Sequence, residues 1–185
     1  KMQEVSMSKP NNQLVISALG EDHPGIVNEL SHAIYQLGCS ISDSRMTILG
    51  GEFAMLLLIE GPWNQLAKLE GQVKELEKKL GLTIVSRHTQ RLPSKGDKLP
   101  YAVEVVSLDN PGIVHKLSNL FAQRHINIEE LITSTYSAPH TGTQMFSVEL
   151  NIGVPAQTQI TELRDEFMDF CDGMNLDAVL EPLKK

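Results

Sequence analysis

The sequence contains two copies of one short motif that could bind a small anionic ligand. Asp22-His23-Pro24-Gly25-Ile26-Val27 recurs as Asp109-Asn110-Pro111-Gly112-Ile113-Val114, with five of six positions identical and an offset of 87 residues. In each copy a short apolar segment precedes the motif, and apolar residues with helical spacing follow it. A glycine at a helix start lets a ligand approach the backbone, and the free N–H groups there attract anions such as a carboxylate.

A purely structural role for these residues is also open at this point, and capping preferences favour it. Aspartate is a preferred N-cap residue, and proline suits the first helical turn because its missing N–H would have no partner there. Asp22 and Asp109 could therefore cap two helices without binding any ligand. The recurrence indicates only that both copies inherited the same loop.

The elements that would position the two loops follow one order in both copies. In the first copy the pattern predicts a strand at 14–19 and a helix that Asp22 caps and Gly38 ends. Strands at 40–49 and 53–59, a helix at 63–80 and a strand at 82–90 follow. In the second copy the same elements are expected at 100–108, 111–124, 126–137, 143–152, 156–172 and 175–181, with six extra residues in the hairpin around 138–142. This βαββαβ order predicts an α+β fold of two tandem ferredoxin-like domains.

Each domain should contain a four-stranded antiparallel sheet with two helices on one face, because both crossovers are right-handed. The expected domains are residues 12–92 and 99–183, joined by a linker at 93–98 that is rich in proline, glycine and charged residues.

The strand expected at 53–59 is apolar at every position, Phe-Ala-Met-Leu-Leu-Leu-Ile, which is typical of a strand covered on both faces. The two helices can cover only one face. The sheet of the second domain or a second copy of the chain could cover the other face. We therefore expect an interface on the outer face of the first sheet and a homo-oligomer, with a dimer as the simplest assembly.

Composition and charge exclude several classes of function. The 185 residues include 16 Lys and Arg against 23 Asp and Glu, and the net charge of −7 would repel a phosphate backbone. Direct nucleic-acid binding is therefore not expected. The longest apolar run is too short to span a bilayer and no signal peptide is evident, so we expect a cytoplasmic protein without a membrane partner.

Signals for catalysis and for cofactors are missing from the sequence. It has no nucleophile elbow, phosphate loop or dinucleotide fingerprint. The only cysteines, Cys39 and Cys171, are expected to be small buried residues, and the six histidines show no close metal-ligand spacing. We therefore expect no enzyme activity, no metal and no cofactor.

The paired loops and the βαββαβ order resemble the ACT domain family, small ligand-sensing modules that commonly bind amino acids and regulate amino-acid metabolism. The resemblance covers the chain from about Leu14 to Leu183. In this family ligands lie beside the loop that joins the first strand to the first helix. Carried over by position, the resemblance nominates ligand-binding residues at Asp22, His23, Gly25 and Ile26 and at Asp109, Asn110, Gly112 and Ile113. Asn127, at the start of the following strand, adds an amide that could bond a ligand carboxylate or amine.

The resemblance implies a non-catalytic amino-acid sensor that represses transcription by binding a DNA-binding activator, with glycine as the ligand. An alternative function of the same fold is a regulatory subunit that mediates feedback control of an amino-acid metabolic enzyme. A small ferredoxin-like enzyme is a third possibility, because this fold hosts unrelated functions. An acylphosphatase-like site would need an arginine in a phosphate-binding loop, and neither motif contains one.

Overall fold

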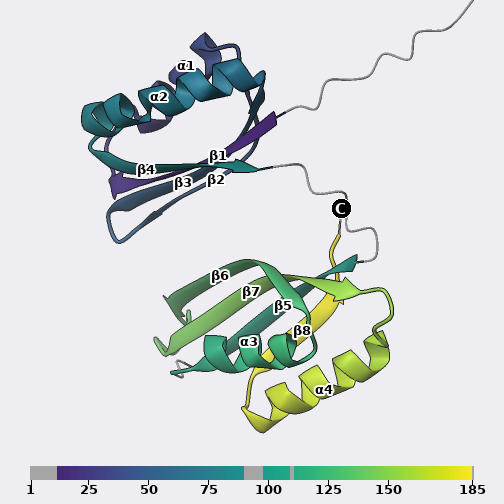
Figure 1. Ribbon diagram of the computed structural model, residues 1–185. Helices are drawn as coiled ribbons and strands as arrows, with labels where there is room; N and C mark the ends of the chain where they lie inside the picture. The colour runs from purple at the N-terminus through teal and green to yellow at the C-terminus, as the bar shows by residue number, and fades with distance from the viewer. Residues whose placement is uncertain (1–11, 90–97, 109–110, 185) are drawn as a thin grey trace, which may run out of the picture. The chain divides into compact units, whose positions relative to one another are not determined.

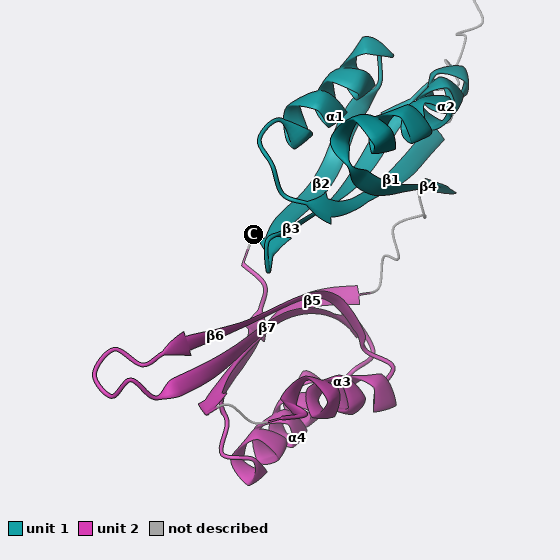
Figure 2. Cartoon of the chain, turned by 90° about the vertical axis from the view of Figure 1, so that its left-hand side faces the viewer, with its two compact units in different colours: residues 1–93 teal, residues 94–185 magenta. Residues whose placement is uncertain are grey.

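The computed structural model describes residues 12–89, 98–108 and 111–184. Contacts divide the chain into two compact units, Lys1–Pro93 and Ser94–Lys185, which we call unit 1 and unit 2 (Figure 2). Each unit has a four-stranded antiparallel sheet with two helices on one face (Figure 1). The tandem βαββαβ fold expected from the repeat is therefore confirmed.

Unit 1 follows the expected order of elements. They are β1 (Asn12–Glu21), α1 (Ile26–Gln36), β2 (Ser40–Leu49), β3 (Glu52–Gly61), α2 (Trp63–Leu80) and β4 (Leu82–Thr89). The strands lie in the order β2-β3-β1-β4, so β2 and β4 form the two edges. Gly50 and Gly51 make the turn between β2 and β3, both with positive φ, a conformation that glycine adopts without steric cost.

The core of unit 1 lies between the sheet and its two helices. Alternate residues of β1 and β3 point toward the helices, and one apolar stripe of each helix meets them. The buried residues of β1 and β3 are Leu14, Ile16, Ala18, Phe53, Met55, Leu57 and Ile59, and those of α1 and α2 are Ile26, Leu30, Ala33, Ile34, Leu66, Leu69, Val73 and Leu80.

Unit 2 repeats this arrangement. Its elements are β5 (Lys98–Leu108), α3 (Ile113–Gln123), β6 (Asn127–Ser137), β7 (Gln144–Pro155), α4 (Ile160–Gly173) and β8 (Asp177–Pro182), with strand order β6-β7-β5-β8. Phe121 of α3 and Phe167 of α4 are fully buried and stack with ring centroids 6.1 Å apart. This pair joins the two helices of unit 2.

Several boundaries differ from those expected from the sequence. The strand expected to end at residue 152 continues to Pro155, and the following helix begins at Ile160 rather than at 156. Val154 is buried, so the longer strand extends the apolar face of the sheet. Of the expected linker 93–98, residue 98 belongs to β5 and the remainder lies outside the described residues. The domain boundaries 12–92 and 99–183 stay a prediction.

The uniformly apolar strand β3 is buried on the face that the helices cover. Phe53, Leu57 and Ile59 are at most 1% exposed, whereas Leu56 between them is 52% exposed. Leu19 and Val85, on the neighbouring strands, are also exposed on the face away from the helices. The expected partner surface on this outer face stays a prediction.

Candidate functional site

The loop between β1 and α1 presents a helix N-terminus without a side-chain cap. Gly25 is the N-cap residue and has φ of 94°, in the left-handed region that favours glycine. The first hydrogen bond of the helix runs from Glu29 N to the Gly25 carbonyl oxygen at 3.0 Å. The backbone N–H groups of Ile26, Val27 and Asn28 precede that bond, so they are the donors that a ligand anion could use.

Unit 2 has the same geometry at its first helix. Gly112 is the N-cap of α3 with φ of 87°, and Lys116 N donates to its carbonyl oxygen at 3.0 Å. Apart from each glycine and its two chain neighbours, no heavy atom of the described residues lies within 4 Å of the Cβ position of Gly25 or Gly112. Space is therefore open beside both loops. Asp109 and Asn110 lie outside the described residues.

The structural interpretation of Asp22 as a helix cap is wrong. Asp22 lies three residues before the N-cap Gly25, and α1 receives no side-chain capping hydrogen bond. Instead the backbone N–H of Asp22 donates to the Gly51 carbonyl oxygen at 3.1 Å. A left-handed glycine takes the cap position because the chain must turn sharply from β1 into α1. The carboxylate of Asp22 is consequently not committed to the helix, and residue 22 is exposed.

Three segments of unit 1 meet at this end of the sheet. They are the β1–α1 loop, the turn Gly50–Gly51 and the junction of α2 with β4 at Leu80 and Gly81. A Cβ on Gly20 would lie 2.8 Å from the Gly81 carbonyl oxygen, so the end of β1 and this junction approach too closely for a larger residue.

An ion pair also joins the two helices at this end. Lys79 Nζ donates to Glu29 Oε2 at 2.7 Å, and this contact lowers the pKa of the Glu29 carboxyl. Sequence reasoning missed this pair because its residues are 50 positions apart. The βαββαβ topology was the available signal, since it places the start of the first helix and the end of the second at one end of the sheet.

His23 is exposed, and its ring lies between two backbone carbonyl groups at this junction. Its Nε2 lies 2.8 Å from the Leu80 carbonyl oxygen and its Nδ1 lies 3.0 Å from the Pro24 carbonyl oxygen. The Leu80 carbonyl raises the pKa of His23 most, followed by the Pro24 carbonyl. Both ring nitrogens are therefore engaged by the backbone, and the ring has no nitrogen left for a ligand in this geometry.

The other nominated residues are not all at the loops. Ile26 and Ile113 are 2% and 1% exposed, so only their backbone groups are accessible to a ligand. Asn127 is exposed at the start of β6, opposite Gly153 in the register. It lies at the other end of unit 2 from Gly112, because α3 carries the chain from one end of the sheet to the other. The structure does not bring Asn127 to the loop.

Neither cysteine of the chain has a reactive thiol. Cys39 and Cys171 are both buried free cysteines, as expected from the sequence. Burial raises the pKa of the Cys39 thiol and raises that of Cys171 to about 11, so both thiols are poor nucleophiles near neutral pH.

Two further structural observations concern metals and membranes. Within residues 12–89, 98–108 and 111–184, no cluster of three or more His, Cys, Asp or Glu side chains is arranged to hold a metal ion. In the same ranges no helix combines the length and apolar character needed to cross a membrane.

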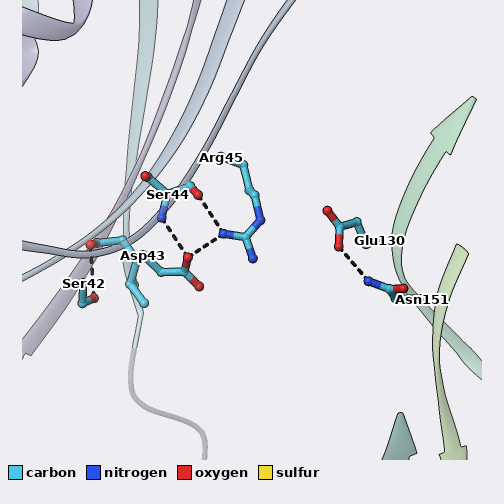
Figure 3. Close-up of polar contacts among 7 residues, drawn as sticks. Ser42, Asp43, Ser44, Arg45, Glu130 and Asn151 are labelled. Atoms are coloured by element: carbon cyan, nitrogen blue, oxygen red, sulfur yellow. Dashed lines mark hydrogen bonds and ion pairs between the residues drawn. The ribbon is translucent and has the colours of Figure 1, made fainter. Parts of the chain in front are cut away.

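The outer faces of the two sheets carry different polar groups, which Figure 3 shows in close-up. In unit 1, Arg45 Nη1 donates to Asp43 Oδ1 at 2.6 Å and to the Ser44 carbonyl oxygen at 2.7 Å. In unit 2, Asn151 Nδ2 donates to Glu130 Oε2 at 2.8 Å. Both groups lie just after a register shift in an edge strand, at Ile41/Asp43 in β2 and Ile128/Glu130 in β6.

Comparisons with known proteins agree with this architecture. Residues 12–86 match the model of the ACT domain. The glycine cleavage system transcriptional repressor of Escherichia coli (strain K12) is 32% identical over 162 residues, which cover 88% of this chain and 85% of that protein.

Two solved structures also match nearly the whole chain. A protein from Galdieria sulphuraria superposes with a TM-score of 0.77 at 28% identity, covering 94% of this chain and 99% of the other. A candidate glycine cleavage system transcriptional repressor superposes with a TM-score of 0.69 at 29% identity, covering 95% and 99%. The chain therefore belongs to the ACT-domain family, as a tandem ACT protein similar over most of its length to the glycine cleavage system transcriptional repressor.

Proposed function

We propose that this protein is a non-catalytic, cytoplasmic amino-acid sensor that represses transcription of glycine cleavage genes. In this proposal it binds glycine and contacts a DNA-binding activator protein. The observation that carries the proposal is the similarity to the Escherichia coli repressor over both units. Similarity to one ACT domain alone would suggest regulation without indicating what is regulated.

The geometry of the loops supports an amino acid as the ligand. Gly25 and Gly112 each begin a helix, and no side chain among the described residues caps the first N–H groups of either helix or fills the space beside its glycine. Such a site favours the carboxylate of an amino acid because the backbone dipoles and N–H groups both attract negative charge. In unit 1 the exposed Asp22 lies in the same loop and could accept a hydrogen bond from the amino group of the ligand.

The charge of the chain supports regulation through protein contact. With a net charge of −7, the protein has no counterion release to drive binding to DNA. Repression then requires that it bind a protein already on the promoter. Because ligand and partner bind one molecule, thermodynamic linkage requires that each change the affinity for the other, typically by about 1–3 kcal/mol.

A homo-oligomer is part of the same proposal. Leu19, Leu56 and Val85 leave an apolar surface on the outer face of the unit-1 sheet, each more than half exposed. Burying one aliphatic side chain stabilises an interface by roughly 1.5–3 kcal/mol. We therefore place the contact with a second copy on this face.

The experiment is calorimetry on the full chain with the activator of the glycine cleavage genes, in the presence and absence of glycine. We expect glycine to bind the chain alone, and we expect the affinity for the activator to change severalfold when glycine is present. A promoter DNA fragment without the activator should show no binding. Identical affinity for the activator in both conditions would contradict the mechanism.

A capture experiment in cell lysate distinguishes the alternative function, a regulatory subunit of a metabolic enzyme, from the proposed transcriptional repressor. A partner that proves to be an amino-acid metabolic enzyme, with its activity changed by this chain and glycine, would favour a regulatory subunit over a transcriptional repressor. Turnover of an acyl phosphate by the pure protein would overturn the non-catalytic assignment.

A further inference from the structure

The two hydrogen-bonding contacts of His23 can both be satisfied only when its ring is protonated. Nε2 faces the Leu80 carbonyl oxygen at 2.8 Å and Nδ1 faces the Pro24 carbonyl oxygen at 3.0 Å. A carbonyl oxygen only accepts hydrogen bonds, and neutral imidazole has a single N–H donor. Loss of one proton therefore leaves a ring nitrogen lone pair facing a carbonyl lone pair.

The Leu80 contact joins two segments that are 57 residues apart. Leu80 is the last residue of α2, and Gly81 ends that helix in the left-handed conformation. Carbonyl groups at a helix C-terminus carry partial negative charge, so they favour a cation over a neutral ring. The protonated ring of His23 thus ties the β1–α1 loop, two residues before its N-cap glycine, to the end of α2.

The charges around His23 come from three elements. Glu21 at the end of β1 and Asp22 in the loop both favour the protonated ring. The last turn of α2 carries Lys78 and Lys79.

The neighbouring helix partly offsets these cations, because Lys79 is paired with Glu29 of α1 at 2.7 Å. Farther along α2, the Glu77 carboxylate accepts a hydrogen bond from Ile84 N at 2.7 Å. The turn Gly50–Gly51, which also contacts the loop, has no titratable side chain. The two carbonyl contacts and the two adjacent carboxylates together raise the pKa of His23 above 6.5.

We propose that His23 is a positioning residue rather than a ligand contact, and that its imidazolium holds the β1–α1 loop of unit 1 against the C-terminus of α2. Because a raised pKa means that the folded state binds the proton more tightly, this contribution is fully present at low pH. It is lost as the pH rises through the folded-state pKa of His23. In the sequence, the equivalent position of unit 2 is Asn110, which does not titrate. This histidine contact and the proton dependence that comes from it should therefore be absent from the unit-2 loop.

The test is an NMR titration of the isotopically labelled full chain between about pH 5 and 9, a range that brackets the usual histidine pKa. The histidine ring signals and the hydrogen exchange of the Gly25, Ile26 and Val27 amides are followed together. We expect His23 to titrate above 6.5, and exchange of the three amides to accelerate beyond the intrinsic pH trend across the same midpoint.

Two variants and one control make this result specific. In His23→Gln the amide can still donate to the Leu80 carbonyl but cannot titrate, so the loop should stay protected without a pH midpoint. In His23→Ala the loop should exchange faster at every pH. His32→Asn, at an exposed position of α1, should leave the wild-type behaviour unchanged. A His23 pKa at or below 6.5, or loop exchange that is insensitive to both variants, would overturn the proposal.

A ligand arm extends the test and depends on the proposed function. If glycine binds at the unit-1 loop, its affinity should fall as the pH rises through the His23 midpoint, by at most about tenfold per pH unit for one linked proton. The His23→Gln variant should lose this dependence. Absence of glycine binding at any pH would contradict the proposed ligand, while the exchange data would still decide the role of His23.

Discussion

The two units share one fold but differ in the sheet face that their helices leave uncovered. In unit 1, Ser17 lies opposite Leu56 at the centre of that face, whereas the corresponding cross-strand pair of unit 2 is Glu104 opposite Glu149. The helix-facing positions are apolar in both units. The comparison shows that both units keep their fold through the same buried apolar core. The outer face of the sheet does not contribute to that core, so it can be apolar where it contacts another surface or charged where it faces water.

The units also differ where the chain must adopt positive φ after a helix. Unit 1 uses Gly38 and Gly81, with φ of 69° and 68°, and unit 2 uses His125 and Asn175 at the equivalent positions, with φ of 56° and 55°. Histidine and asparagine are among the side chains that tolerate this region best. The turn geometry is therefore conserved between the copies although the residues are not.

The largest expected effect is a difference in stability between substitutions on the two faces of β3. Leu57→Asp should lower the stability of unit 1 by about 4 kcal/mol or more, because it buries an unpaired carboxylate in the core. Leu56→Asp should change the stability of unit 1 by about 1 kcal/mol or less, because this position is half exposed and unit 2 already has Glu149 there. Chemical denaturation of both variants measures the difference.

Each unit carries its own reporter for this experiment, because Cys39 is buried in unit 1 and Cys171 in unit 2. Alkylation followed by mass spectrometry should show faster labelling of Cys39, and not of Cys171, in Leu57→Asp. The matched variant Leu150→Asp should reverse this pattern. Equal labelling of both cysteines in either variant would contradict independent cores.

The Leu56→Asp variant also tests whether copies of the chain associate. If the outer face of unit 1 contacts a second copy, Leu56→Asp should shift the protein toward monomer in analytical ultracentrifugation. A wild-type protein that is monomeric at all concentrations would contradict the proposed oligomer. An assembly that is unchanged in Leu56→Asp would place the interface elsewhere.

A smaller effect is expected at the junction between α2 and β4. Gly81→Ala should destabilise unit 1 by about 1–2 kcal/mol, because alanine is strained at positive φ and no neighbouring atom adds a clash. Gly81→Asn should cost less, since unit 2 places Asn175 at the equivalent turn. Thermal or urea unfolding measures both. An asparagine variant that is no more stable than the alanine variant would show that the two turns are not equivalent.

The smallest effect concerns the paired glutamates of unit 2. Glu149→Leu, which copies Leu56 of unit 1, should stabilise unit 2 by about 0.2–1 kcal/mol by removing like charges that lie directly opposite each other. The gain should shrink as salt rises, because exposed charges are screened. Denaturation at low and high ionic strength tests this, with Glu162→Leu on the exposed surface of α4 as the control. A gain independent of salt would attribute the effect to hydrophobicity alone.

The fold was predictable from the sequence because the spacing of apolar residues indicates which side chains are buried, and the repeat indicates that both halves share one order of elements. The alternation of Phe146, Val148, Leu150 and Ile152 gave the correct helix-facing side of β7. The uniformly apolar β3 could not reveal which residues face the helices, because its pattern has no period. Pairing with β1 decides which alternate residues of β3 face the helices, because the buried Ile16 lies opposite Leu57.

The candidate site was predictable only in part. The loop glycines Gly25 and Gly112 were placed near the helix N-termini, because glycine and proline mark such turns strongly, but Asp22 rather than Gly25 was expected as the cap. The contact of His23 with Leu80 could not be found, since it depends on a backbone carbonyl far away in the sequence. Asn127 was grouped with the loop by order along the chain, but α3 separates the two positions in space.

The most direct test of the central claim is a backbone NMR titration of the full chain with glycine. If the loop before the first helix of each unit binds the ligand, glycine should cause saturable shifts of nearby amide signals. These are the signals of Ile26, Val27 and Asn28 in unit 1 and those at the start of α3 in unit 2. Signals near Asn127 at the other end of unit 2 should not move. Absence of any saturable shift, or shifts confined to residues away from both loops, would contradict the account.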